Sequence, residues 1–241
     1  MAYSLIGKDF IPPDVHGKVT GKAKYAEDFK VDGMLHARLL TSPVPHARIV
    51  RLDVSKALQM EGVVAVLTAD DVPSIPNLGN PILTNEPAYV GDPILAIAAI
   101  NEGVAEDALQ AINFDFEPLP FVVDPLTSLR PGGPHARTQG NVGNATMQDD
   151  FRSIHWSNDE MASLINGDLP QGESAREWIV GDLEAGFAAA AYTIDESFVT
   201  ASYSHNSMEP RSALAYWENG KCFLYGSSQS QSFPVPALAG Y

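Results

Sequence analysis

Hydrophobic and polar positions in the first half of the chain follow two patterns, and both predict strands. Residues 34–41 and 46–54 carry polar side chains among apolar ones, whereas residues 62–68 and 93–100 are short and almost wholly apolar. Runs of the second kind are typical of strands buried on both faces. These segments therefore predict four strands, two of them buried.

A helix and a further strand are predicted directly after the fourth strand. Asn101 can cap residues 102–113, because a side-chain oxygen at this position accepts from a free backbone N–H of the first turn. Residues 114–117 alternate aromatic and acidic side chains, which predicts a half-buried strand. With a second short helix capped by Ser55, these elements make an α+β module. One face of the longer helix would carry Val104, Ala108, Leu109 and Ile112.

The strongest local signal in the second half is the Asn-Gly dipeptide at 219–220, which lies between two apolar runs. Asn-Gly is typical of a two-residue type I′ turn, in which both residues have positive φ. The sequence therefore predicts a hairpin of strands 213–218 and 221–226, with favourable charged and aromatic pairs across it. Cys222 would lie opposite Trp217 and is expected to be a packed, unreactive thiol.

Between these two regions the periodicity disappears. Residues 131–180 are rich in Pro, Gly, Asn and acidic side chains, and we interpret them as a linker. A short helix is predicted within it over residues 159–165, with Asn158 as its cap and Gly167 after its end. Order returns at Asp182, which can cap an Ala-rich helix over residues 183–191. Apolar alternation then predicts a strand over residues 192–200.

Composition narrows the classes of partner. The 241 residues include 30 acidic and 15 basic side chains, a net charge of −15, which disfavours nucleic acid and anionic membranes as partners. The single cysteine excludes an internal disulfide and an iron–sulfur cluster held by this chain alone. No apolar run approaches the roughly 20 residues of a membrane span, and no export signal is evident, so a cytoplasmic location is expected.

Two sets of motifs resemble the molybdenum-binding subunit of the xanthine dehydrogenase/aldehyde oxidase family. The first set flanks the hairpin and consists of His205, Met208-Glu209-Pro210-Arg211, Ala213 and Ser227-Ser228-Gln229. The second set consists of Val19-Thr20-Gly21-Lys22-Ala23-Lys24-Tyr25-Ala26-Glu27-Asp28, Ser42-Pro43-Val44-Pro45-His46-Ala47-Arg48-Ile49, Val90-Gly91-Asp92-Pro93 and Phe116-Glu117-Pro118-Leu119-Pro120. Several matches in the correct order are more specific than any one of them.

The resemblance implies an α+β fold, in which an α/β hammerhead domain is followed by the first part of a mixed α/β molybdopterin-binding domain. It divides the chain into an N-terminal arm (1–19), the hammerhead domain (20–130), the linker (131–180) and the beginning of the molybdopterin-binding domain (181–241).

The resemblance also implies one cofactor-binding residue. Gln229 stands where the family has a glutamine that reaches an oxo ligand of the metal, and a neutral amide can donate there without adding charge. Gln231 is close enough to be the alternative. Glu209 precedes Pro210 and is expected to be structural, satisfying turn amides or pairing with Arg211, rather than a catalytic base.

No metal ligand and no catalytic residue are expected within this chain. His36 and His46 lie in or beside predicted strands and are expected to be structural or exposed rather than metal ligands. No two histidines have the i, i+4 spacing of a zinc helix. The family's Gly-rich loop and its glutamate base have no match in the sequence. The chain is therefore not expected to be active alone.

The resemblance implies that the chain is part of a molybdenum hydroxylase or dehydrogenase. Such an enzyme oxidises an aldehyde or an N-heteroaromatic substrate with water as the oxygen source. The implied cofactor is molybdenum bound to molybdopterin, in a dinucleotide form, shared with a polypeptide that carries the remaining molybdopterin domains. Iron–sulfur clusters and FAD are expected only on other subunits. Because a partial domain would leave the apolar face of the hairpin uncovered, the isolated chain is expected to be poorly soluble or oligomeric.

Two alternatives stay open. The chain could be a non-catalytic assembly or scaffolding subunit that keeps the hammerhead but holds no cofactor. It could also be an unrelated α+β hydrolase, although it has no Gly-x-Ser-x-Gly elbow, no Gly-x-Gly-x-x-Gly motif and no P-loop.

Overall fold

The described residues of the computed structural model form two compact units. One unit combines Met1–Leu35 with Ser204–Tyr241, and the other is His36–Tyr203. Described are residues 4–72, 81–144, 148–164, 169–170, 178–196, 198, 200, 203–207, 209–228, 235 and 238.

A three-stranded antiparallel sheet forms the centre of the larger unit. Its middle strand β4 (Pro93–Ala99) pairs with β1 (His36–Thr41) on one side and β3 (Val63–Leu67) on the other. The predicted burial of the middle strand is confirmed, since Ile94, Leu95, Ile97 and Ala99 are fully buried. The other apolar run is a strand as predicted, but β3 lies at the sheet edge and is only partly buried.

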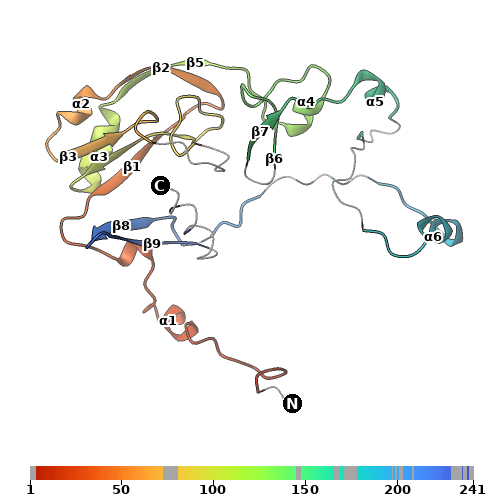
Figure 1. The fold of residues 1–241 in the computed structure, drawn as a ribbon, viewed down its shortest axis with the longest axis horizontal. Helices are drawn as coiled ribbons and strands as arrows, with labels where there is room; N and C mark the ends of the chain where they lie inside the picture. The colour runs from red at the N-terminus through yellow and green to blue at the C-terminus, as the bar shows by residue number, and fades with distance from the viewer. Residues whose placement is uncertain are drawn as a thin grey trace. The chain divides into compact units, whose positions relative to one another are not determined.

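The helix α3 (Glu102–Gln110) packs against β1 and β4, as Figure 1 shows. Its predicted cap is confirmed, because Asn101 Oδ1 accepts a hydrogen bond from the backbone N of Val104 at 2.9 Å. The helix ends three residues earlier than the sequence predicted. The apolar core between helix and sheet includes Ala57, Leu95, Ile97, Ala108 and Ile112.

A second, two-stranded antiparallel sheet pairs β2 (Ala47–Asp53) with β5 (Asn113–Pro118). The short helix α2 (Ser55–Leu58) follows β2. The prediction of Ser55 as N-cap was wrong by one position, because Val54 is the cap residue. The carboxylate of Asp53 takes the capping role instead and accepts from the backbone N of Ser55 at 3.1 Å.

The described part of the stretch with little periodicity contains short elements, and the sequence pattern predicted only the last of them, a helix near residue 159. They are α4 (Pro125–Leu129), β6 (Val142–Asn144), β7 (Gln148–Arg152) and α5 (Asn158–Ala162). The cap of α5 is Ser157 and not the predicted Asn158. Local caps explain the helices: Asp124 accepts from the backbone N of Leu126, and Ser157 forms a reciprocal capping box with Glu160.

The helix α6 (Leu183–Ala189) begins as predicted, with Asp182 Oδ1 accepting from the backbone N of Ala185 at 3.0 Å. The strand predicted after it was wrong, since the described residues from 192 to 200 form no strand. Tyr192, Ile194 and Phe198 are instead more than four-fifths exposed. Apolar alternation specifies a strand only where a neighbouring strand supplies hydrogen bonds.

The smaller unit contains α1 (Val15–Val19), the 3₁₀ helix η1 (Ala26–Asp28) and the strands β8 (Ala213–Glu218) and β9 (Lys221–Gly226). The α+β fold class is confirmed. None of the helices in the described part of the chain has the length and apolar character of a membrane-spanning segment.

Candidate functional site

The hairpin β8–β9 has the predicted register. The turn residues Asn219 and Gly220 have φ values of 51° and 73°, both in the left-handed region. Glu218 is paired with Lys221 across the turn, as expected for a two-residue loop. The hairpin prediction is therefore confirmed to the residue.

The two faces of the hairpin differ because side chains alternate along a strand. On one face Tyr216 stacks on Phe223, with ring centroids 5.0 Å apart, and Phe29 stacks on Tyr225 at 4.7 Å. The other face carries Cys222, which is exposed. The prediction of a packed thiol was therefore wrong, since pairing with a large aromatic residue across the strands does not bury a side chain on an uncovered face.

The open ends of the hairpin are tied together by Glu209. The Ser227 hydroxyl donates to Glu209 Oε1 at 2.9 Å, and the carbonyl oxygen of Pro210 lies 3.3 Å away. The partner of Glu209 is thus a hydroxyl and neither of the predicted ones, turn amides or Arg211. That Glu209 is structural and not a base stays a prediction.

A pocket of about 280 Å³ lies between η1 and the hairpin. It brings together two motifs that are far apart in the sequence, the segment around Tyr25 and the segment around Glu209. The Tyr25 backbone N donates to Asp28 Oδ2 at 2.9 Å and so fixes the η1 turn. The pocket is lined by Lys24, Tyr25, Ala26, Phe29, Glu209, Leu224, Tyr225 and Gly226.

The predicted cofactor residue Gln229 lies outside the described residues, and so does the alternative, Gln231. The described chain leads up to them through Ser227, whose hydroxyl is held at the end of β9. In the described part of the chain, no three His, Cys, Asp or Glu side chains gather as a metal site would require.

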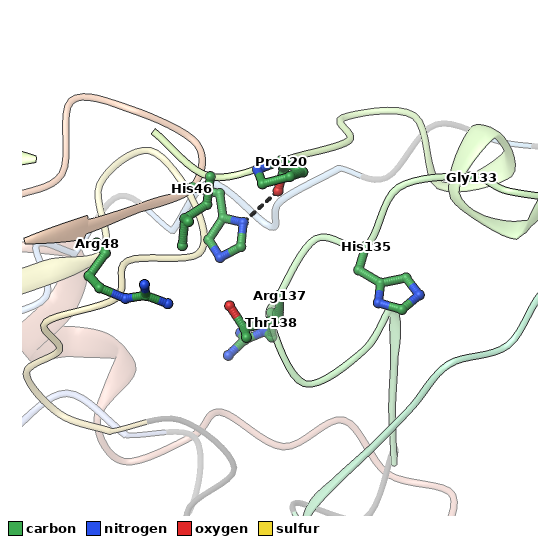
Figure 2. A pocket seen from close by; sticks show the side chains of 8 residues that line it. His46, Arg48, Pro120, Gly133, His135, Arg137 and Thr138 are labelled. Carbon is green, nitrogen blue, oxygen red and sulfur yellow. Dashed lines mark hydrogen bonds between the residues drawn. The ribbon is translucent and has the colours of Figure 1, made fainter. Parts of the chain in front are cut away.

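The larger unit has a second polar cluster, which sequence reasoning missed. His46 is almost fully buried, and its Nδ1 lies 2.5 Å from the carbonyl oxygen of Pro120, as Figure 2 shows. Since a carbonyl oxygen can only accept, Nδ1 carries a proton. His46 Nε2 lies 3.5 Å from Glu86 Oε1.

Glu86 also contacts Arg48 and Thr138. Arg48 is 3.2 Å from Glu86 Oε2, and the Thr138 hydroxyl donates to Glu86 Oε1. Burial alone would raise the pKa of Glu86. The contacts with Thr138, Arg48 and His46 outweigh burial, so the pKa of this carboxyl lies below its ordinary value.

The cluster borders a pocket of about 450 Å³, and the side chains of His46, Arg48 and Thr138 point toward one another beside it (Figure 2). Of the residues in this cluster, a sequence motif marked only His46 and Arg48, which lie in Ser-Pro-x-Pro-His-Ala-Arg. Glu86, Arg137 and Thr138 come from segments that no periodicity marks.

Two family models match the chain, in order. The model described as "Aldehyde oxidase and xanthine dehydrogenase, a/b hammerhead domain" matches residues 20–120, and the "Molybdopterin cofactor-binding domain" model matches residues 166–239.

Curated relatives agree with these matches. The chain is 32% identical to a probable xanthine dehydrogenase subunit of Bacillus subtilis, over 91% of this chain and 26% of the relative. It is 29% identical to the nicotinate dehydrogenase large molybdopterin subunit of Eubacterium barkeri, over 99% of this chain and 51% of the relative. The chain thus spans between a quarter and about half of these relatives' length.

Solved structures show the same similarity. Quinoline 2-oxidoreductase from Pseudomonas putida 86 matches 97% of this chain and 28% of its own, with a TM-score of 0.68 and 26% identity. Aldehyde oxidoreductase from Desulfovibrio gigas matches 95% of this chain and 24% of its own, with a TM-score of 0.65 and 26% identity. The chain belongs to the xanthine dehydrogenase/aldehyde oxidase family and corresponds to the hammerhead domain and the start of the molybdopterin-binding domain of its large subunit.

Proposed function

We propose that the chain is part of a molybdenum hydroxylase, in which it holds one side of the molybdenum cofactor. The observation that carries this proposal is the succession of both family domains on one chain, the hammerhead at residues 20–120 and the cofactor-binding domain at residues 166–239. The match to the cofactor-binding domain favours this proposal over a scaffold that holds no cofactor.

The residues around the hairpin fit a cofactor that carries oxo groups. Gln229 carries an amide group without charge, and such a group can donate a hydrogen bond to an anionic ligand. The contact between Ser227 and Glu209 would fix the start of the segment that leads to Gln229. When bound, the molybdenum cofactor supplies the oxidation itself, and this chain contributes binding and orientation.

The names of the relatives support a proposal for the substrate class. Nicotinate dehydrogenase and quinoline 2-oxidoreductase are named for N-heteroaromatic compounds, and aldehyde oxidoreductase is named for aldehydes. We propose one of these two classes as substrate, with water as the oxygen source. The cofactor would be a dinucleotide form, shared with a polypeptide that carries the remaining molybdopterin domains, with iron–sulfur clusters and FAD on further subunits.

Metal analysis after native purification tests the proposal. The tagged chain is purified together with its stable partners, and molybdenum is measured per mole of chain. We expect molybdenum in stoichiometric amount and a fall of about tenfold or more in Gln229→Ala, as is usual when a residue that orients a metal site is removed.

Gln231→Ala is the matched control, since it removes the same amide two residues further on. Loss of molybdenum in Gln231→Ala alone would move the assignment to that residue. A stable complex that contains no molybdenum would overturn the hydroxylase proposal in favour of an assembly subunit.

A further inference from the structure

We propose that the pocket beside Arg137 in the larger unit binds a small organic monocarboxylate, a molecule with one carboxylate group on an apolar or aromatic body. The volume of about 450 Å³ lies within the range of sites for small molecules. Arg48 and Arg137 border the pocket from two different segments (Figure 2). The proposal involves only the unit His36–Tyr203 and is independent of molybdenum and of Gln229.

The first observation is an arginine without a carboxylate partner. Arg137 is half-buried, and it makes no ion pair within the described part of the chain. The Glu86 carboxylate cannot serve it, because Oε1 accepts from Thr138 and Oε2 pairs with Arg48 at 3.2 Å. Two guanidinium groups against one carboxylate leave one positive charge at the pocket. This excess is local, since the chain as a whole has 30 acidic and 15 basic side chains.

The second observation is that the Arg137 side chain is held in place. Its guanidinium lies over the Phe151 ring, 4.8 Å from the ring centroid. This contact occupies one side of the guanidinium, whereas the N–H groups lie in its plane and stay available for a ligand. A side chain that is already held loses little conformational freedom when it binds a ligand.

The backbone that carries Arg137 is fixed as well. The Gly140 backbone N donates to the Arg137 carbonyl oxygen at 3.2 Å and closes a turn. Gly140 is buried, and a Cβ there would lie 2.5 Å from the Arg152 carbonyl oxygen, so the turn packs directly on β7. The Asn141 backbone N donates to the same Arg152 oxygen at 3.0 Å. This wall of the pocket is therefore formed without a ligand.

The arginines, and not the histidines, are the anion-binding groups of this pocket. Nε2 of His46 faces the Glu86 carboxylate at 3.5 Å. Nε2 of His135 lies 2.7 Å from the Ser153 hydroxyl and 3.0 Å from Nε2 of His155. Both atoms thus face groups of the protein, and the proposal requires no particular protonation of either ring.

A monocarboxylate fits this charge and these walls. A guanidinium binds the two oxygens of a carboxylate in a bidentate manner, and such charge-assisted hydrogen bonds are among the strongest in proteins. One carboxylate neutralises the one positive charge, whereas a dianion would leave a negative charge uncompensated. Leu119 and Pro120 supply apolar lining, and the volume leaves room for a ring or a short alkyl chain beside the carboxylate.

Equilibrium dialysis of the full chain, purified with its stable partners, tests the site. Labelled benzoate is the probe, and benzamide is its uncharged counterpart of similar shape. We expect saturable binding of benzoate at millimolar concentration or below, with one site per chain. Benzamide should bind about tenfold more weakly or worse, and Arg137→Gln should weaken benzoate binding by a similar factor, because both changes remove a charge-assisted pair.

Arg51→Gln is the matched control. Arg51 lies on the same strand as Arg48, but it pairs with Asp53 and Asp115 and is not part of the pocket lining, so its loss should leave benzoate binding unchanged. Should Arg137→Gln fold poorly, modification of arginines by phenylglyoxal gives a second readout on the unsubstituted chain. Peptide mass spectrometry should show that benzoate slows the modification of Arg137 and leaves that of Arg51 unchanged.

Several results would overturn the proposal. They are benzoate binding that does not saturate, equal binding of benzoate and benzamide, equal affinity of the parent and a folded Arg137→Gln, an equal loss in Arg51→Gln, and modification of Arg137 at the same rate with and without benzoate. Phthalate, the dianion with the same ring, should bind no more tightly than benzoate. Tighter binding of phthalate would overturn the assignment to a single carboxylate.

Discussion

Glu86 shows how one carboxylate can organise a region that has little regular structure. It accepts from Thr138, pairs with Arg48 and faces His46, and these partners lie up to 52 positions from Glu86 along the chain. Since Arg48 is a cation and the His46 ring is buried, the carboxylate stabilises both side chains in this position. Its removal would leave a buried imidazole and an arginine without compensation.

The substitution Glu86→Gln is expected to lower the stability of the chain at neutral pH by about 1–3 kcal/mol, the usual contribution of a hydrogen-bonded charged group. The measurement is chemical unfolding of both proteins. Glu106→Gln, on the exposed side of α3, removes a carboxyl without such contacts and should change stability little. A Glu86 variant as stable as the parent would contradict this role.

The pH dependence of stability tests the same group separately. The pKa of Glu86 is lower in the folded chain than its ordinary value of 4.5. Its stabilising contribution is therefore complete above that value and is lost as the pH falls through the lower, folded pKa. We expect the melting temperature of Glu86→Gln to fall less steeply than that of the parent below about pH 4.5. If the melting temperatures of the two proteins fell in parallel with pH, the stabilising role of the Glu86 carboxylate would be contradicted.

The sequence predicts the hydrogen-bond partner of Asn101 but not the partners of Glu86. Asn101 was predicted as a cap because its partner, the Val104 backbone N, is three positions away. The contact of Glu86 with Thr138 spans 52 positions between two irregular segments. No periodicity links such segments, so this part of the pocket emerged only from the tertiary structure.

Among the elements, the hairpin was the most predictable. Gly220 occupies a left-handed conformation with φ of 73°, which an L side chain adopts only with strain. We expect Gly220→Ala to destabilise the hairpin by about 1 kcal/mol, measured as faster amide hydrogen exchange in β8 and β9.

Gly226→Ala is the matched control in the same hairpin. Gly226 does not have a positive φ, and a methyl group there would meet only the Ala213 Cβ and the Ser212 carbonyl oxygen, at an ordinary 3.8 Å. Its exchange should therefore stay close to that of the parent. Equal acceleration in both variants would show that the turn conformation is not the cause.

The strand predicted over residues 192–200 failed for a reason that also applies to Cys222. Both predictions used side-chain pattern alone, and a pattern tells which positions could be buried, not what covers them. In the hairpin the aromatic face meets Phe29, whereas the face of Cys222 meets nothing in the described part of the unit that buries it. Burial depends on a second surface, which a local pattern does not contain.

At the scale of the whole molecule, large apolar side chains remain exposed from Trp178 onward. Trp178, Tyr192, Phe198 and Tyr203 are each about nine-tenths exposed. Isolated apolar residues are common on surfaces, but so many within one segment are typical of a surface that another chain covers. The domain boundaries that we assign around this segment stay predictions.

This exposure predicts that the isolated chain self-associates. Light scattering across a range of concentrations should give a mass that rises with concentration. The double substitution Ile194→Ser and Phe198→Ser should reduce the rise in mass, because it removes two side chains of one segment that are 82% and 89% exposed.

The pair Ile11→Ser and Val123→Ser is the control, since these side chains are 78% and 81% exposed elsewhere in the chain. A parent chain that stays monomeric at every concentration, or a control pair that is equally effective, would show that the segment around Ile194 is not an association surface.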